Sequence, residues 1–409
     1  MAAQDPFVIV GGGLAGAKAA ETLREEGFDG PVVLLAEEPE QPYERPPLSK
    51  EYLLGTAPRE KARVHETGWY EAHDIDLRTG VRGTALDAGA HRLTLDSGEE
   101  LAYARLLLAT GAAPRRLPVP GADLDGVHYL RTLADSDRLL AELSGGGRRV
   151  VVVGAGWIGL EVAAAARHHG NPVTIVEPQP TPLHAVLGQE LGSRFAALHR
   201  HHGVDLFTDT TVRELRGSGG RVGSVVTDAH AGLPADLMVV GVGAVPRTEL
   251  AAAAGLEVDN GVVTDHALRT SAPDVYAAGD VASSFRPLYG RHVRVEHWAN
   301  ALHSGPAAAR SMLGQDVTYD RVPYFFTDQY DLGMEYSGLA GPGATVVYRG
   351  DPDSGEYIAF WLEDGRVTAG MNVNVWDVTD PIQELIRTRR TVPVAALADV
   401  GTPLERLAG

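Results

Sequence analysis

Two glycine-rich stretches have the residue types and the spacing to bind a phosphate group. Residues 7–20 read FVIVGGGLAGAKAA, and residues 150–163 read VVVVGAGWIGLEVA. In each G-x-G-x-x-G pattern the glycines allow a tight turn, a close approach of the backbone to a pyrophosphate, and close packing of a helix on a strand. The helix that follows points its N-terminal N–H groups at the negative charge. The sequence therefore predicts two dinucleotide sites. Their patterned glycines are Gly11, Gly13, Gly16, Gly154, Gly156 and Gly159.

An acidic residue closes the strand after each pattern, Glu37 after the first and Glu177 after the second. A carboxylate in this position accepts hydrogen bonds from an adenosine ribose. A charge-assisted hydrogen bond from the ribose hydroxyl to the Glu177 carboxylate is worth about 1.5–3 kcal/mol. The same carboxylate would repel the 2′-phosphate of NADPH. Residues 178–185, PQPTPLHA, contain no Arg or Lys that could hold a phosphate. We therefore expect NADH, and His184 is the one nearby group that could weaken this preference.

The 409-residue chain contains no cysteine. This excludes disulfides, thiolate metal sites and redox-active cysteine pairs. The histidine-rich tracts at 167–169 and 199–202 lack the acidic or cysteine residues that complete a metal site, so we expect solvated or helix-capping histidines and no metal. Electrons that reach a bound dinucleotide have no acceptor within the protein, and we expect them to leave to an external one.

The charge balance narrows the range of partners. The chain carries 54 acidic and 36 basic residues, a net charge of −18. Such a chain repels nucleic acid and anionic membranes. Its start, MAAQDPFVIVGGG, lacks the basic region of a signal peptide, and no apolar run reaches the roughly 18 residues that span a bilayer. We therefore expect a cytoplasmic protein with neither nucleic acid nor membrane as a partner.

The elements that position these residues follow from hydrophobic patterning. The first 35 residues read as strand, turn, helix and strand, and residues 148–177 repeat this βαβ plan. A length of 409 residues predicts two or three domains. Residues 320–375 are rich in aromatic and β-branched residues, with a hairpin turn expected at Asp364-Gly365, and a helix is expected to begin near Asp380-Pro381. The predicted fold class is α/β, with two Rossmann-like domains and a small α+β C-terminal domain.

Longer motifs carry a resemblance to a known family. They are PYERPPLSK at 42–50, LLLATGAAPR at 106–115, VYAAGDVA at 275–282, VEHWANALHSG at 295–305 and YFFTDQYDLGMEYSG at 324–338. With them the chain resembles the FAD-dependent NADH:ferredoxin reductases that serve bacterial cytochrome P450s and ring dioxygenases, relatives of the apoptosis-inducing-factor flavoproteins. The resemblance implies a glutathione-reductase-like fold with FAD and NADH as cofactors. It implies an FAD domain at 1–113 and 244–319, an NADH domain at 114–243 and a C-terminal domain at 320–409.

The resemblance also implies a role for individual residues. FAD would be held by Gly11, Gly13, Leu14, Ala15, Gly16, Glu37, Arg45, Lys50, Val81, Ala109, Thr110, Gly111, Arg131, Asp280 and Trp298. NADH would be held by Gly154, Gly156, Trp157, Ile158, Gly159, Glu177 and Gly243.

Lys50 and Glu161 are the predicted catalytic pair. Glu161 is flanked by apolar residues in the helix after the second pattern, a poor place for an unpaired charge, because removing one partner of a buried pair costs about 3–5 kcal/mol. The resemblance places Lys50 beside the flavin N5 atom, with Glu161 orienting both the lysine and the nicotinamide.

The external acceptor that the resemblance implies is a ferredoxin, which supplies a P450 or a ring-hydroxylating oxygenase. Ferredoxins are usually acidic, so an acidic reductase needs a local basic docking face, and Arg286, Arg291 and Arg294 precede Trp298 in a position to provide one. Three alternatives stay open: a rubredoxin reductase, a cysteine-free NADH oxidase, and a redox-switched interaction protein of the apoptosis-inducing-factor type.

Overall fold

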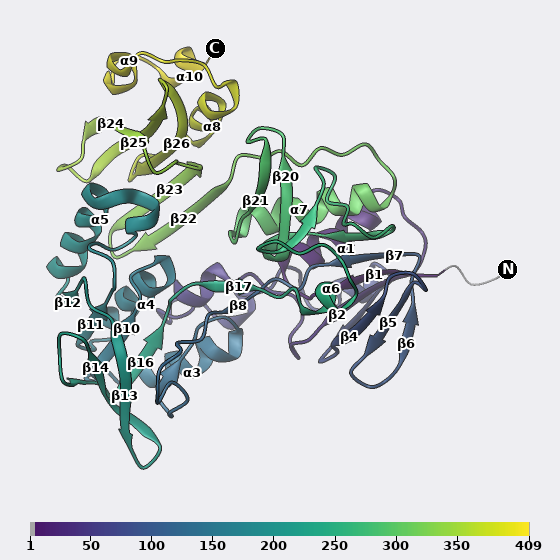
Figure 1. The fold of residues 1–409 in the computed structure, drawn as a ribbon, viewed down its shortest axis with the longest axis horizontal. Coiled ribbons are helices and arrows are strands. Elements are labelled where there is room, and N and C mark those ends of the chain that lie inside the picture. Colours follow the sequence, from purple (N-terminus) through teal and green to yellow (C-terminus); the bar gives the residue numbers. More distant parts are fainter. Residues whose placement is uncertain (1–4, 409) are drawn as a thin grey trace.

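The structure, a computed structural model, describes residues 5–408. It contains two five-stranded parallel sheets, one on each side of the chain crossings, and a third, antiparallel sheet near the C-terminus (Figure 1). The first sheet has the order β19-β7-β1-β2-β3. Its strands are β1 (Phe7–Val10), β2 (Val32–Ala36), β3 (Ile75–Thr79), β7 (Arg105–Leu108) and β19 (Val275–Ala277). Residues of the first and last thirds of the chain therefore share one sheet.

Helices α1 (Leu14–Glu25) and α7 (Trp298–Met312) pack against each other beside the first sheet. Small residues allow this, since a Cβ at Gly305 would lie 2.2 Å from the carbonyl oxygen of Ala15. The same unit includes short helices and strands around its rim. They are η1 (Pro46–Ser49), η2 (Arg59–Ala62), α2 (Trp69–Ala72), β4 (Gly83–Asp87), β5 (Arg92–Leu95), β6 (Glu100–Ala102), α6 (Glu249–Ala253), β18 (Val262–Thr264), η3 (Gly279–Val281), β20 (Ala282–Arg286) and β21 (Arg291–Arg294).

The second parallel sheet has the order β12-β11-β10-β16-β9. Its strands are β9 (Val127–His128), β10 (Val150–Val153), β11 (Val173–Val176), β12 (Val204–Phe207) and β16 (Leu237–Val240). The helices of this unit are α3 (Leu133–Leu143), α4 (Trp157–His168) and α5 (His184–His201), and a small antiparallel sheet follows in β13 (Val212–Ser218), β14 (Arg221–Thr227) and β15 (Leu233–Pro234). All four residues of the central strand β10 are buried, as expected for a strand covered on both faces.

The chain crosses between the two parallel sheets twice, and the crossings pair with each other. β8 (Ala112–Pro114) and β17 (Ala244–Pro246) form an antiparallel two-stranded ribbon. This pairing holds the two units in a defined relation, which Figure 1 shows at the centre of the molecule. The two-Rossmann fold class predicted from the repeated βαβ plan is confirmed, whereas the predicted domain boundaries stay a prediction.

The C-terminal unit is an antiparallel sheet with the order β22-β23-β26-β25-β24. Its elements are β22 (Tyr324–Gln329), β23 (Leu332–Gly338), β24 (Thr345–Asp351), β25 (Glu356–Glu363), β26 (Arg366–Val373), α8 (Thr379–Thr388), α9 (Val394–Ala398) and α10 (Leu404–Ala408). The predicted hairpin is present: Asp364 and Gly365 have φ of 50° and 73°, the left-handed pair that a two-residue hairpin turn requires. The predicted tail helix is also present.

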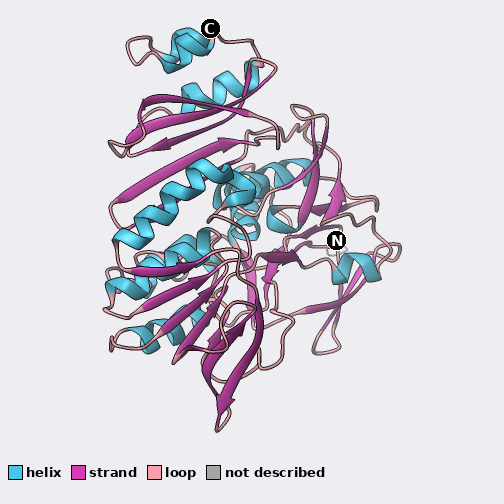
Figure 2. Cartoon of the chain, turned by 60° about the vertical axis from the view of Figure 1, so that its left-hand side comes forward, coloured by secondary structure: helices cyan, strands magenta, loops and turns pink. Residues whose placement is uncertain are grey.

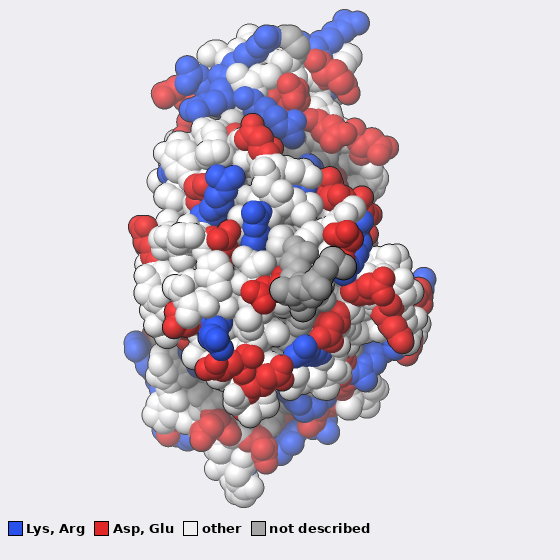
Figure 3. Space-filling view, turned by 90° about the vertical axis from the view of Figure 1, so that its right-hand side faces the viewer, with Lys and Arg blue, Asp and Glu red and all other residues white. Residues whose placement is uncertain are grey.

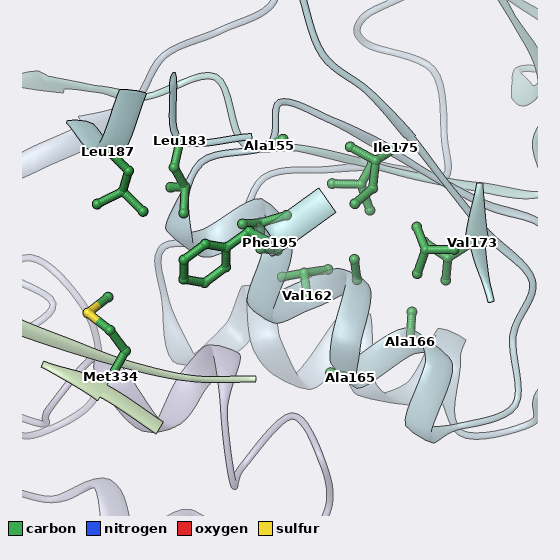
Figure 4. Packing of buried hydrophobic residues seen from close by; sticks show 14 of the residues in the cluster. Ala155, Val162, Ala165, Ala166, Val173, Ile175, Leu183, Leu187, Phe195 and Met334 are labelled. Carbon is green, nitrogen blue, oxygen red and sulfur yellow. The ribbon is translucent and has the colours of Figure 1, made fainter. Parts of the chain in front are cut away.

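The C-terminal sheet shares an apolar core with the second parallel unit. Phe195 and Leu187 of α5 pack in one cluster with Met334 of β23 (Figure 4). Figure 2 shows helices of the second unit lying beneath the C-terminal sheet. The position of the C-terminal sheet is therefore set by burial of the α5 face.

His199 of α5 lies in this interface and is fully buried. Its Nε2 atom lies 2.9 Å from Oε1 of Gln329 on β22. The expectation that the histidines of the 199–202 tract are solvated or helix-capping is wrong for His199. The reason is tertiary: the face of α5 that carries His199 is covered by a sheet formed from residues far along the chain.

Stability should depend on pH through His199. Burial lowers the pKa of His199 from 6.5 to about 4, so between these pH values the unfolded chain binds a proton that the folded chain does not. Folding stability should therefore fall as the pH drops through this window, by about 3 kcal/mol for this one group. Denaturant unfolding of the wild type and His199→Gln at pH 4 to 7 measures this. The variant should lose about 3 kcal/mol less, and equal losses would contradict the prediction.

Candidate active site

One large cavity lies at the carboxyl ends of the first parallel sheet and extends toward α4 of the second unit. Its volume of about 1120 Å³ exceeds the roughly 300–1,000 Å³ typical of sites for drug-sized ligands, as a dinucleotide requires. Most of the predicted site residues line it. They are Gly11, Gly13, Leu14, Ala15, Glu37, Arg45, Lys50, Val81, Ala109, Thr110, Gly111, Arg131, Trp157, Ile158, Glu161, Asp280 and Trp298.

The remaining predicted site residues lie outside the lining of this cavity: Gly16, Gly154, Gly156, Gly159, Glu177 and Gly243. Two of them are packing positions. A Cβ at Gly16 would lie 2.0 Å from the Gly11 carbonyl oxygen, and a Cβ at Gly159 would lie 2.1 Å from that of Gly154. The third glycine of each pattern therefore lets the helix pack on its own turn.

The first glycine pattern is built to leave space for a ligand. Gly11 has φ of +131°, and a Cβ there would lie 2.1 Å from the Ala109 carbonyl oxygen. Gly13 has extended backbone and caps the N-terminus of α1, and a Cβ there would meet no atom within 4 Å. The open space thus lies directly before the first-turn N–H groups of α1, which have no partner within the helix.

The second pattern repeats this geometry. Gly154 has φ of +96°, and a Cβ there would lie 2.4 Å from the Gly241 carbonyl oxygen. Gly156 caps α4 in extended conformation and faces open space. Both turns therefore have the shape that receives a pyrophosphate at a helix N-terminus.

Two arginines from distant segments meet beside the cavity. Arg131 Nη2 lies 2.9 Å from Asp280 Oδ2, and Arg45 donates to the carbonyl oxygen of Arg131. The Arg131 Nε atom is buried and has no hydrogen-bond partner among the described residues. Burial and the adjacent Arg45 guanidinium lower the pKa of Arg131. A buried donor without a partner, on a residue that lines the cavity, fits an anionic ligand such as the pyrophosphate of FAD.

The two ribose-binding candidates differ in their surroundings. Glu37 is exposed and accepts a hydrogen bond from Arg247, which lowers the Glu37 pKa. Glu177 is buried, and its two carboxylate oxygens accept the backbone N–H groups of Ala155 at 2.6 Å and Gln179 at 2.9 Å. Glu177 therefore also holds the second glycine turn in shape, a role that the sequence pattern did not indicate. Each carboxylate oxygen keeps a lone pair for a ribose hydroxyl.

Lys50 and Glu161 form a buried ion pair. Lys50 Nζ lies 2.8 Å from Glu161 Oε1, with side-chain exposures of 10% and 2%. Ser49 Oγ donates to the other carboxylate oxygen at 2.5 Å, and Thr327 Oγ1 donates to Oε1 at 2.6 Å. The sequence indicated Lys50 and Glu161 but not Ser49 or Thr327. The available signal was that Ser49 and Thr327 lie within two of the motifs that carry the resemblance, PYERPPLSK and YFFTDQYDLGMEYSG.

Aromatic side chains close one end of the cavity. The Trp298 indole donates to Glu44 at 3.1 Å and meets the Phe326 ring edge-on. The Lys50 ammonium lies 5.2 Å from the centre of the Phe326 ring. His297 lines the cavity, stacks on Phe325, and has its pKa lowered to about 4 by burial, so its imidazole is neutral at neutral pH. The sequence did not single out His297 or Phe325.

The predicted docking arginines are not all at the surface. Arg286 is only 2% exposed. Its guanidinium lies over the Tyr319 ring and donates to Asn300 Oδ1 at 3.0 Å, so Arg286 is a core residue, and its assignment to a docking face is wrong. Arg291 is exposed, as predicted, and Arg294 pairs with Glu296. Arg286 ends β20 and is the cross-strand partner of Arg291 on β21. It is buried because its guanidinium packs against Tyr319 and Asn300, contacts that its position in the sequence did not indicate.

Within residues 5–408 no cluster of three or more potential metal-ligating His, Asp or Glu side chains is found. None of the helices in this range has the length and apolar character needed to cross a membrane.

Comparisons with known proteins agree with this geometry. Residues 5–305 match the family described as Pyridine nucleotide-disulphide oxidoreductase, and residues 324–408 match Reductase C-terminal. The chain is 42% identical to the anthranilate 1,2-dioxygenase system ferredoxin–NAD(+) reductase component of Burkholderia cepacia, covering 97% of this chain and 96% of the relative. It is 36% identical to putidaredoxin reductase CamA of Pseudomonas putida, covering 100% and 97%. The covalent putidaredoxin reductase–putidaredoxin complex contains a similar structure, with a TM-score of 0.95, 36% identity and coverage of 99% and 98%.

Removal of the Lys50 charge should destabilise the protein strongly. Lys50→Met leaves the Glu161 carboxylate buried without a cation, and we expect a loss of about 3–5 kcal/mol of unfolding free energy. Lys50→Met combined with Glu161→Gln removes both charges and should restore part of this loss. Denaturant unfolding of cofactor-free protein measures it.

The control is Arg387→Met, which breaks the exposed pair with Glu384 on α8. We expect it to cost at most about 1 kcal/mol. Equal losses in Lys50→Met and Arg387→Met would show that Glu161 is stabilised without Lys50.

Proposed function

The chain belongs to the pyridine nucleotide-disulphide oxidoreductase family, and on this basis we propose that it transfers electrons from NADH through FAD to a ferredoxin. The observation that carries the proposal is a dinucleotide-sized cavity that begins at the first phosphate-binding turn and reaches Trp157 and Ile158, which follow the second turn, in a chain without cysteine. Without a thiol pair, the electrons have no internal acceptor beyond the cofactor.

The residues present fit both cofactors. FAD would lie in the cavity, with its pyrophosphate against Gly13 and the Arg131 Nε donor and its ribityl chain near Asp280. NADH would lie against Gly156, with Trp157 and Ile158 close to the nicotinamide. Ile158 is 45% exposed although it is large and apolar, which favours a ligand surface over it. Glu177 supports a preference for NADH over NADPH, because its carboxylate repels a 2′-phosphate.

Bound FAD would supply the conversion of one hydride from NADH into two single electrons for an iron–sulfur protein. The chain positions and tunes this chemistry. Lys50 places a positive charge at the site, Glu161 keeps that charge in one place, and Trp298 and Phe326 exclude water from one end of the cavity. No residue is needed as a general acid or base for the hydride transfer itself.

We infer a docking face for the ferredoxin beside the cavity. It differs from the face predicted from the sequence because the buried Arg286 is left out of it. Exposed Arg291 lies on β21, the strand that leads to the cavity-lining residues 296–298. Arg389 donates to the Leu288 carbonyl oxygen at 3.0 Å. The end of α8 therefore lies against the loop between β20 and β21. Figure 3 shows Lys and Arg gathering over the C-terminal helices of this acidic protein. The exposed arginines there are Arg387, Arg389, Arg390 and Arg406.

The proposed activity predicts a specific dependence on the acceptor. Purified protein should be yellow with bound FAD, and NADH should reduce cytochrome c slowly by itself but at least about tenfold faster when an iron–sulfur ferredoxin is added. Oxygen consumption without ferredoxin should be slow. Fast oxygen reduction would favour an NADH oxidase, and a rubredoxin that replaces the ferredoxin would favour a rubredoxin reductase. Failure to bind FAD would reject all three.

Charge reversal at Arg291 should weaken ferredoxin binding. We expect Arg291→Glu to raise the KM for ferredoxin about tenfold at low ionic strength, and the difference should shrink as salt screens the charges. Arg213→Glu on β13 is the control, since Arg213 is also exposed but belongs to the small sheet of the second unit. The same rise in both variants would show a general charge effect and would remove Arg291 from the docking face.

A further inference from the structure

A chain of buried polar side chains runs from the Glu161 carboxylate to α5. Thr327 Oγ1 lies 2.6 Å from Glu161 Oε1, and Gln329 Nε2 lies 3.2 Å from Thr327 Oγ1. His199 Nε2 lies 2.9 Å from Gln329 Oε1, and Tyr330 Oη lies 3.4 Å from His199 Nδ1. Thr327 and His199 are fully buried, and Gln329 is 1% exposed.

The hydrogen atoms of this chain can be placed by counting donors. The Gln329 amide nitrogen only donates, so Thr327 Oγ1 accepts from it, and the single Thr327 hydroxyl hydrogen is left for Glu161. The Gln329 oxygen only accepts, so the hydrogen between it and His199 is on His199 Nε2. The opposite amide orientation would put the Gln329 oxygen against Thr327 Oγ1, whose hydrogen is already used by Glu161.

The protonation state of His199 completes the chain. Burial lowers the pKa of His199 to about 4, so at neutral pH only one ring nitrogen carries a hydrogen. With that hydrogen on Nε2, Nδ1 is an acceptor and receives the Tyr330 hydroxyl. Each donor from Tyr330 to Thr327 therefore points toward the Glu161 carboxylate.

This chain connects the three units at the proposed hydride-transfer site. Glu161 and His199 lie on α4 and α5 of the second unit, Thr327 and Gln329 lie on β22, and Lys50 comes from the first unit. The Glu161 carboxylate accepts three donors, from Lys50, Ser49 and Thr327. Hydrogen bonds in a polarised chain strengthen one another in a low-dielectric interior.

We propose that Tyr330, His199, Gln329 and Thr327 form a directional positioning chain that holds the ionised Glu161 carboxylate, and through it the Lys50 ammonium, in one place at the flavin. The consequence for turnover rests on the proposed function. The chain itself is a property of the polypeptide and can be tested without cofactor.

The test of the chain uses histidine labelled with ¹⁵N in cofactor-free protein. The His199 signal, identified by its loss in His199→Gln, should show a neutral ring with hydrogen on Nε2 at pH 7. Thr327→Val removes the hydroxyl that orients Gln329, so the amide can turn and His199 should show a mixture of both tautomers. Thr327→Ser keeps the hydroxyl and should restore the wild-type signal. A wild-type ring protonated at pH 7, or with hydrogen on Nδ1, overturns the proposal.

The same variants test positioning in FAD-loaded protein. Rapid-mixing measurements with NADH should show hydride transfer about tenfold slower in Thr327→Val, with an unchanged KM for NADH and recovery in Thr327→Ser. Thr264→Val is the matched control, because Thr264 is also a buried strand threonine and its hydroxyl has no partner among residues 5–408. It should leave the tautomer and the rate unchanged.

The outcomes separate the two proposals. The predicted tautomers in a protein that does not bind FAD would support the chain and reject the proposed function. The predicted tautomers with an unchanged rate in Thr327→Val would overturn the positioning role, as would an equal effect of Thr264→Val.

Discussion

The cost of burying the Glu161 charge is the constraint on which the arrangement of the three units depends. An isolated carboxylate in a protein interior is strongly unfavourable unless it is paired and fully hydrogen-bonded. Here the compensating donors come from Lys50 and Ser49 of the first unit and from Thr327 of the C-terminal sheet. Glu161 is satisfied only when all three units are closed around it. The apolar contacts between α5 and β23 and the β8–β17 ribbon favour the same closed arrangement, so packing and electrostatics select one geometry.

The absence of cysteine determines where the electrons go after they reach the cofactor. The family name includes disulphide chemistry, yet the segment after the first βαβ unit carries the PPLSK stretch of residues 46–50, and its lysine enters the ion pair. This segment therefore supplies a fixed positive charge and no cysteine that could accept electrons. A positive charge stabilises a reduced, anionic cofactor, but it cannot accept electrons. The electrons must then leave through the edge of the cofactor, and a partner must approach that edge closely.

Much of this organisation was predictable from the sequence because it is local. The glycine turns, the βαβ units, the hairpin at Asp364-Gly365 and the tail helix each depend on a few neighbouring residues. The Lys50–Glu161 pair is not local: a charge in an apolar helix requires a partner, and the family resemblance indicated Lys50 as that partner. The burial of Arg286 and His199 could not be predicted, since both polar residues are covered by segments far away in the sequence. Thr327 and Gln329 were missed for the same reason: their function appears only when β22 lies against α4 and α5.

The two glycine turns have the same backbone shape but different electrostatic surroundings, and we propose that this difference suits the first turn to a permanent cofactor and the second to an exchanging one. Beside the first turn lie Arg131 and Arg45, with a buried donor that has no other partner. Beside the second lies the buried carboxylate of Glu177. Fixed cations in an enclosed site stabilise a bound pyrophosphate strongly, which suits FAD that stays bound through many cycles. A site with a buried anion holds a dinucleotide mainly through helix N–H groups and ribose hydrogen bonds, which suits NADH that must leave as NAD⁺ after each hydride transfer.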